Sequence, residues 1–145
     1  MPKIRGTRKG RSGAAMVELA ISMTLLLVVM GGTIDLGRFA YYYVSLSDGV
    51  GAGGRFASYH PRTTATLASY NAKTRQAVLD GMQGITGFDP SMVTIPDPVI
   101  TTDPAPFAFQ RVNVQAQYDF RTIFAWPLVP SQITISRSVE MRMVR

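Results

Sequence analysis

The chain has 145 residues, a formal charge of +6, a single histidine (His60) and no cysteine. The lack of cysteine excludes disulfides, thiolate metal sites and cysteine nucleophiles, and a lone histidine excludes a histidine-rich metal site. The positive charge is concentrated before Ala14, where no acidic residue occurs and the basic residues are Lys3, Arg5, Arg8, Lys9 and Arg11. Without residues 1–13, ten basic and nine acidic residues remain. That balance argues against a nucleic-acid-binding domain, which needs a basic surface.

An apolar stretch follows the basic segment. Residues 19–34 contain no charged residue, and residues 14–17 extend the stretch with an interruption only at Glu18. A helix rises about 1.5 Å per residue, so about 20 residues of this kind cover the roughly 30 Å hydrocarbon thickness of a bilayer. The sequence therefore predicts a membrane-spanning helix.

The residues on either side of this helix predict its orientation. The basic N-terminal flank is expected to stay in the cytoplasm, and the aromatic residues Phe39, Tyr41, Tyr42 and Tyr43 favour the opposite interface. The N-terminus is then inside and the rest of the chain is exported. Two alternatives remain: a secretory signal peptide, although no A-x-A cleavage site follows and Glu18 is unusual there, and an anchored protein that is never processed.

The start of the apolar stretch carries a recognisable motif. Gly13, Ala14 and Glu18 have the spacing of a prepilin processing site, with glycine before the cut, a small residue after it and glutamate as the fifth residue of the mature chain. Two further motifs follow in order, Asp35-Leu36-Gly37-Arg38 and Gly53-Gly54-Arg55-Phe56-Ala57. Over about residues 10–58 the chain resembles the TadE-like family of pilin-related proteins.

This resemblance implies a function in assembly. It suggests a minor pilin or pseudopilin of a bacterial tight-adherence (Flp-type IV) pilus system, a system of cell adhesion. Leu19 stands where the major Flp pilins carry tyrosine, which favours a minor component. The implied partners are a prepilin peptidase, other pilin or pseudopilin subunits, the assembly machinery and the bacterial inner membrane, with no nucleic acid and no cofactor. The implied location is a single pass through that membrane, with the C-terminal domain on the periplasmic or extracellular side.

The resemblance also implies a division of the chain. A prepilin peptidase would cut between Gly13 and Ala14, so that residues 1–13 are a cleaved basic leader. Residues 14–58 would form the transmembrane and membrane-proximal helix, and residues 59–145 a small exported domain.

Glu18 is the candidate carboxylate for processing and assembly. It lies one helical turn after Ala14, on the same face, and a negative charge is favoured near a helix N-terminus. Charges within a membrane usually pair, so Glu18 is expected to neutralise the new amine of Ala14, in its own chain or in a neighbour. The alternative is a glutamate that extends to the lipid headgroups without a partner.

Six residues are candidates for helix interfaces, and each has a second interpretation. Asp35 and Arg38 can pair on one face of a continuing helix, or remain two solvated charges, with Gly37 between them. Small residues four apart, Gly49 and Gly53, allow close helix packing, but four glycines in residues 49–54 can also form a hinge. A phosphate-binding loop is excluded because no Walker-type lysine follows. Arg55 can pair with Asp48, bind a partner or remain at the surface.

The predicted exported domain is α+β, with one further helix and a short antiparallel sheet. Thr63 or Thr64 is expected to cap the helix, Gly84 and Gly87 to end it, and its apolar stripe to be Leu67, Tyr70, Thr74, Ala77, Val78 and Met82. A proline-rich segment then allows only short edge strands, such as residues 92–95. Alternating patterns predict two long strands. In the first, Val112, Val114, Ala116, Tyr118 and Phe120 face one way, and in the second the alternating residues are Ile133, Ile135, Arg137, Val139, Met141 and Met143. Both helices are expected to cover one sheet face, with Arg137, Arg142 and Arg145 mostly in solvent.

No catalytic constellation is visible in the sequence. There is no G-x-S-x-G motif, and the single histidine has no acidic neighbour in sequence. The chain is therefore expected not to be an enzyme. The alternative to a pilus component is an unprocessed, single-span, membrane-tethered binding module.

Overall fold

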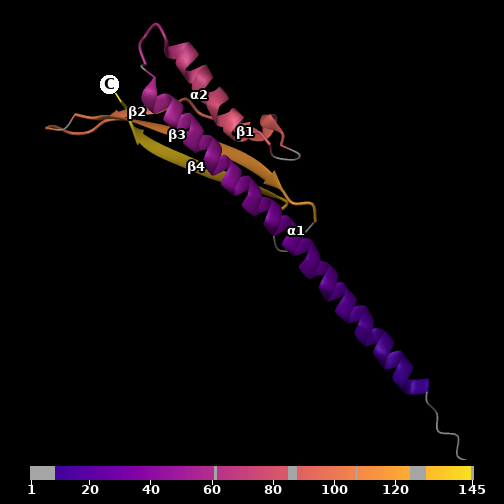
Figure 1. Cartoon of the computed structure of the whole chain (residues 1–145). Helices are drawn as coiled ribbons and strands as arrows, with labels where there is room; N and C mark the ends of the chain where they lie inside the picture. The colour runs from indigo at the N-terminus through magenta and orange to yellow at the C-terminus, as the bar shows by residue number, and fades with distance from the viewer. Residues whose placement is uncertain (1–8, 61, 85–87, 107, 125–129, 145) are drawn as a thin grey trace, which may run out of the picture. The chain divides into compact units, whose positions relative to one another are not determined.

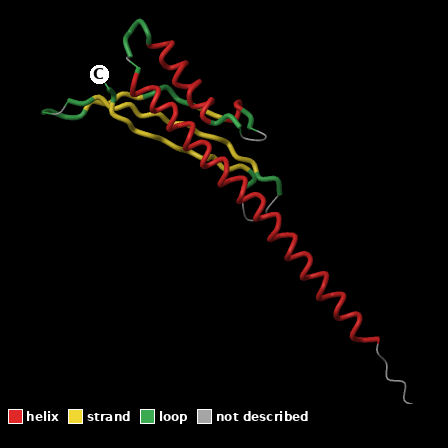
Figure 2. Tube along the Cα trace, in the orientation of Figure 1, coloured by secondary structure: helices red, strands yellow, loops and turns green. Residues whose placement is uncertain are grey.

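The computed structural model describes residues 9–60, 62–84, 88–106, 108–124 and 130–144. The chain divides after Gly37 into two compact units. A single helix, α1 (Lys9–Tyr59), contributes residues to both, and the second unit adds a helix, α2 (Leu67–Gly81), and a small antiparallel sheet (Figures 1 and 2). The predicted α+β class, with a long N-terminal apolar helix, one further helix and a short antiparallel sheet, is confirmed.

The sheet is built around β3 (Gln110–Arg121). Along one edge it pairs antiparallel with β4 (Gln132–Arg142) over the whole length of both strands. Along the other edge it pairs with two short strands, β2 (Val99–Thr102) and β1 (Val93–Thr94), which meet successive parts of it. A short 3-10 turn, η1 (Pro90–Met92), precedes β1. The two long strands follow the alternating pattern of the sequence, while β2 lies within the proline-rich segment where only short edge strands were expected.

The core lies between this sheet and the two helices. All five residues predicted to share one face of β3 are buried. Tyr42, Leu46 and Val50 of α1, which recur every four residues, are buried as well. Tyr42 stacks on Tyr118 with ring centroids 4.8 Å apart and meets Phe120 edge-on at 5.8 Å. Such aromatic pairs contribute about 0.5–1.5 kcal/mol beyond the burial of their area. The predicted arrangement, both helices against one sheet face, matches these contacts and the view in Figure 1.

Glycines bring α1 and α2 together. A Cβ on Gly49 would lie 2.7 Å from the Val78 carbonyl oxygen, and a Cβ on Gly81 would lie 2.8 Å from the Cα of Gly49. A Cβ on Gly53 would overlap Cγ2 of Val78. Since α1 is helical throughout residues 49–54, the glycines serve close packing here and do not form a hinge.

The start of α2 differs from the prediction. The helix begins at Leu67 with Thr66 at the N-cap and no side-chain capping bond, so Thr63 and Thr64 do not cap it. The physical reason is a separate turn just before it. The hydroxyl of Thr63 accepts from the Thr66 N–H (3.2 Å) while the hydroxyl of Thr66 accepts from the Thr63 N–H (3.0 Å). These reciprocal bonds occupy the hydroxyls of Thr63 and Thr66 in a turn that precedes α2, so neither hydroxyl caps the helix.

The end of α2 also comes early. The helix stops at Gly81, with Met82 at the C-cap, and the left-handed backbone at Gly84 (φ +100°) follows. Gly87 lies outside the described residues. Of the predicted apolar stripe, Tyr70, Thr74, Val78 and Met82 are buried, whereas Leu67 is 37% exposed.

Arg137 was predicted to face solvent, and this is wrong. It lies on the inward face of β4 between Ile135 and Val139, where the surface of α1 is polar and aromatic. Its guanidinium lies 4.5 Å from the Tyr43 ring centroid and donates to the Ser47 hydroxyl (3.4 Å). A guanidinium can stack on an aromatic face, which explains its inward place. Arg142 is exposed over Phe109, and Arg145 lies outside the described residues.

We predict that Gly53→Ala destabilises the second unit. The added methyl overlaps Val78, and overpacking costs about 1–3 kcal/mol, against up to about 1 kcal/mol gained in helix propensity. The control is Gly51→Ala, whose Cβ would meet only the guanidinium of exposed Arg55, at 3.5 Å. This substitution should be stabilising. Urea unfolding of the full chain in detergent, followed by near-ultraviolet circular dichroism, measures both. Equal effects of the two substitutions would contradict the close-packing interpretation.

We also predict a loss of stability at alkaline pH. Burial, and then the hydrogen bond and charge of Tyr42, raise the pKa of Tyr118 from 10.0 to about 12. Tyr118 therefore ionises in the unfolded chain before it ionises in the folded one. The stabilisation of the folded state that comes from this pKa difference is complete below pH 10 and is lost as the pH rises towards about 12. Tyr118→Phe, which retains the ring, should flatten this part of the unfolding profile, and an unchanged profile would count against the assignment.

Candidate functional site

The first part of α1 exposes apolar side chains around its whole circumference. None of the residues in its most apolar 18-residue window is buried inside the chain. The consecutive residues 25–30 are all at least half exposed. Because successive residues of a helix point in different directions, this exposure covers every side of the helix. A surface helix of a water-soluble domain would show a polar face instead. The segment from Gly13 onward is long and apolar enough to cross a membrane.

Hydroxyl groups in this segment bond within the helix. The Thr24 hydroxyl donates to the Ala20 carbonyl oxygen (2.9 Å), and the Thr33 hydroxyl donates to the Val29 carbonyl oxygen (2.8 Å). In lipid no water is present to satisfy such groups. These two hydroxyls can therefore enter a bilayer with their donors already paired.

The predicted processing residues lie together at the start of the segment. Gly13, Ala14 and Glu18 are helical and exposed, and nothing lies within 4 Å of the position that a Cβ on Gly13 would take. Glu18 is one turn after Ala14, so the two share a helix face. Nothing in the described chain covers this face, and the arrangement leaves it open to another protein.

Asp35, Gly37 and Arg38 have different surroundings. Asp35 is only 5% exposed, so it is not a solvated charge. Gly37 is exposed, and nothing lies within 4 Å of the position that a Cβ on it would take. Arg38 begins the second unit. Its guanidinium lies 5.3 Å from the Phe120 ring centroid and donates to the Arg121 carbonyl oxygen (3.4 Å). Arg38 is therefore engaged with the end of β3.

Of the remaining interface candidates, two face inward and one faces outward. Gly49 and Gly53 are buried against α2, as described above. Arg55 is exposed, and within the described part of the chain it forms no ion pair with Asp48. Its guanidinium lies back along the helix towards Gly51, at the surface of the second unit.

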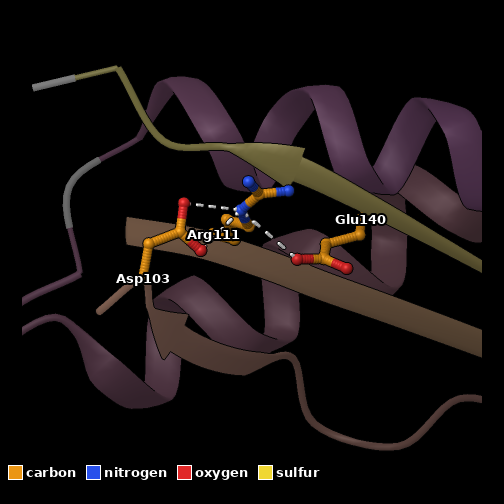
Figure 3. Close-up of polar contacts among 3 residues, drawn as sticks. All are labelled: Asp103, Arg111 and Glu140. Carbon is orange, nitrogen blue, oxygen red and sulfur yellow. Dashed lines mark hydrogen bonds and ion pairs between the residues drawn. The ribbon is translucent and has the colours of Figure 1, made fainter. Parts of the chain in front are cut away.

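One charged cluster was not anticipated from the sequence. The Arg111 Nε lies 2.9 Å from an Asp103 carboxylate oxygen and 3.7 Å from a Glu140 carboxylate oxygen, joining the residue after β2 to β3 and β4 (Figure 3). The hydrogen bond and charge of Asp103 raise the pKa of Arg111. The pairing register of β3 and β4 could have indicated this cluster. It places Glu140 opposite Asn113, which lies on the same face of β3 as Arg111. All three side chains are partly exposed, so the cluster fastens strands at the surface.

The second unit also has two open hollows. Their volumes are about 480 and 700 Å³, and Gln110, Met143 and Val144 line both. Among the described residues that line them there is no acidic residue and no histidine. The described residues also contain no group of three acidic, histidine or cysteine side chains that could hold a metal ion.

His60 has a local role at the end of α1. Its ring stacks on Phe56, with centroids 4.0 Å apart, and its Nδ1 is 2.8 Å from the Phe56 carbonyl oxygen. The residue is exposed, and its contacts are those of a side chain that closes a helix terminus.

Comparison with known proteins finds a family for the N-terminal part of the chain. The family model described as TadE-like protein matches residues 13–55, which run from the predicted cut site through the second glycine-rich motif. No curated protein and no solved structure matches the chain. The match suggests a Tad pilus-associated protein, and one long apolar N-terminal helix fits a single-pass membrane protein of such a system. The resemblance to the TadE-like family is confirmed over residues 13–55.

Proposed function

We propose that the protein is a minor pilin or pseudopilin-like component of a tight-adherence pilus system that acts by assembly and not by catalysis. The observation that carries this proposal is the coincidence of the TadE-like match with the exposed apolar part of α1. A helix that exposes apolar side chains on every side requires lipid or other apolar helices around it. Both are available to a pilin-like subunit, first in the membrane and then in an assembly.

The proposed topology follows from the flanks of this helix. Five basic residues precede Ala14, and the positive-inside rule keeps such a flank in the cytoplasm. The helix then crosses the inner membrane once, and the second unit lies on the exported side. Its core of tyrosine, phenylalanine and aliphatic side chains contains no cysteine and needs no oxidising partner to fold.

The proposed processing step uses the open start of the helix. A prepilin peptidase would cut between Gly13 and Ala14, where the absence of a glycine side chain and the small alanine let the local backbone enter a protease cleft. Hydrolysis of that peptide bond leaves a carboxylate on Gly13 and an amine on Ala14. The amine becomes a cation at the cytoplasmic end of an apolar helix, and Glu18, exposed one turn away, is the nearest carboxylate in sequence.

The proposed role of Glu18 is to neutralise this amine. A lone charge costs up to about 2.5–3.5 kcal/mol at the centre of a membrane and less near its surface, and charges within a membrane usually pair. In an assembly, the partner amine would belong to the same chain or to a neighbouring subunit. The pair would set the axial register of one helix against the next, because apolar packing alone specifies register weakly.

A second candidate function is an unprocessed, membrane-tethered binding module. The observation that favours it is the second unit, which has its own buried core and two open hollows. The two candidates differ in the covalent structure of the mature chain. The first requires a chain that starts at Ala14, and the second retains the basic residues before it.

We predict that Gly13→Leu blocks trimming in the native host. A bulky side chain at the cut site should prevent the backbone from entering the protease, so the intact mass should change from a chain beginning at Ala14 to one that retains the leader. Gly37→Leu is the matched control, because Gly37 also has nothing within 4 Å of its Cβ position and lies far along the helix. Retention of the leader in the unsubstituted protein would refute processing and favour the binding module.

We predict that Glu18→Gln reduces recovery of the protein in complexes with other pilin subunits after solubilisation and co-purification. The expected loss is roughly tenfold or more, since an unpaired charge in the membrane costs up to about 2.5–3.5 kcal/mol. The control is Glu140→Gln, which removes only a partly exposed carboxylate 3.7 Å from Arg111. Equal recovery of the Glu18→Gln variant and the unsubstituted protein would remove the assembly role of Glu18.

A further inference from the structure

Two opposite charges lie on the part of α1 that belongs to the second unit, without a partner among the described residues. Asp48 and Arg55 are both exposed, on the side of the helix away from its buried stripe. No hydrogen bond or ion pair joins either side chain to another described residue. They are seven residues apart in sequence, which is about 10 Å along the helix axis. This separation explains why they do not pair with each other.

Exposed apolar side chains flank these charges on the same side of α1. Val44 is 56% exposed and lies one turn before Asp48, and Tyr59 is 68% exposed and lies one turn after Arg55. Between the charges is Gly51, where an added Cβ would meet only the Arg55 guanidinium.

Together, Val44, Asp48, Gly51, Arg55 and Tyr59 form what we call the outer stripe. One exposed valine or tyrosine would need no explanation. A helix face that meets only water is polar along its length, whereas the outer stripe is apolar at both ends, has no side chain near its middle and carries two charges without partners. This composition suits contact with another helix.

The outer stripe is complementary to a copy of itself. When a second copy of the helix lies alongside in the same direction and is displaced by seven residues, Asp48 of one copy faces Arg55 of the other. The same displacement places Val44 opposite Gly51 of the other copy, so that a side chain fills the space where none is present. Seven residues are nearly two helical turns, and the displaced helix therefore presents the same side to its neighbour.

We propose that the outer stripe binds the outer stripe of a second copy of this chain in this parallel, displaced arrangement, with an ion pair between Asp48 of one copy and Arg55 of the other. Only the parallel direction rests on the proposed function, in which like subunits enter an assembly in one orientation. The choice of a second copy rests on the complementary charges of the stripe itself. The contact is heterologous, because the two copies contribute different residues to it.

The charges select this displacement over the two simplest alternatives. Parallel copies without displacement would place Asp48 opposite Asp48 and Arg55 opposite Arg55, and such like charges repel. An antiparallel pair would join the same two charges but would place Val44 opposite Tyr59 and would turn the two chains in opposite directions. An exposed ion pair alone is weak, so the contact is expected among chains that a membrane or an assembly already concentrates.

Disulfide cross-linking of the full chain in membranes of the native host tests the arrangement. The chain has no cysteine, so every disulfide formed on oxidation reports an introduced pair. Two forms of the protein with different affinity tags are produced together, and disulfides between the two tags are counted. The pair Val44→Cys with Gly51→Cys reports the proposed displacement. Val44→Cys in both forms reports undisplaced helices, and Val44→Cys with Tyr59→Cys reports the antiparallel pair.

We expect the Val44→Cys and Gly51→Cys pair to cross-link several-fold more than the other two pairs. Adding Asp48→Arg or Arg55→Asp to both forms should lower this yield several-fold, because like charges then meet across the contact. Adding both reversals together should restore it, since the attraction returns with its direction inverted, and this recovery guards against an effect of misfolding. The control is Lys73→Glu, a charge reversal at an exposed residue of α2, which should leave the yield unchanged.

Three outcomes would overturn the proposal. Equal cross-linking of all three cysteine pairs would mean that the copies meet only by random collision. Dominant cross-linking of Val44→Cys with Tyr59→Cys would replace the parallel contact by an antiparallel one. A yield that is insensitive to the charge reversals would remove the ion pair.

The intact mass of the same samples separates this proposal from the proposed function. A chain that begins at Ala14 but lacks the expected cross-link refutes the contact and leaves processing in place. A chain that retains its leader and forms the expected cross-link refutes processing and supports the contact.

Discussion

The second unit depends on a close approach of two helix backbones that only glycine permits. Gly49 and Gly53 on α1 and Gly81 on α2 leave no room for a Cβ, so the helices approach closely and Val78 and Met82 reach the interior. The Tyr70 hydroxyl then donates to the Ala57 carbonyl oxygen (2.9 Å) and joins the far ends of the same pair. Each glycine lowers helix stability by up to about 1 kcal/mol, and packing along the whole length of the contact offsets this cost. With the helices so placed, the aromatic rings of α1 meet those of β3.

One continuous helix therefore serves two environments. After Gly37, α1 buries a stripe of Tyr42, Leu46 and Val50 against the core. Its exposed positions there include the charged Asp48 and Arg55 as well as tyrosines and Val44. Before Gly37 the same secondary structure carries apolar side chains on all sides. The change is one of side-chain distribution and not of backbone conformation. It marks where a membrane or apolar partners must replace water.

Much of this arrangement could be predicted from the sequence because the relevant signals are periodic. The alternation in β3 identified all five of its buried residues, and the uninterrupted apolar run identified the candidate span. The errors arose where local chemistry had more than one use. Thr63 bonds to Thr66 in a preceding turn and so does not cap α2, and Arg137 finds an aromatic ring on the inward face where alternation alone gave no partner. The role of the glycines in residues 49–54 could not be predicted without the position of α2. Glycines in a helix can form a hinge or allow a close contact, and what lies opposite them decides between the two.

The distribution of exposed apolar surface argues that the first part of α1, more than the second unit, requires a partner. The core of the second unit is closed by Phe120, Leu46 and Met82, each at most 2% exposed. Arg137 and Arg142 lie over aromatic rings of the unit, and Arg111 pairs with the Asp103 carboxylate. Outside the first part of α1, large apolar side chains are also exposed near the start of the second unit, at Tyr41, Tyr43 and Val44, and at scattered positions elsewhere in it. Exposed apolar surface is concentrated along residues 16–36. A helix that exposes apolar side chains on every side must be covered by lipid or by other apolar helices, so the partner of this segment has to be apolar.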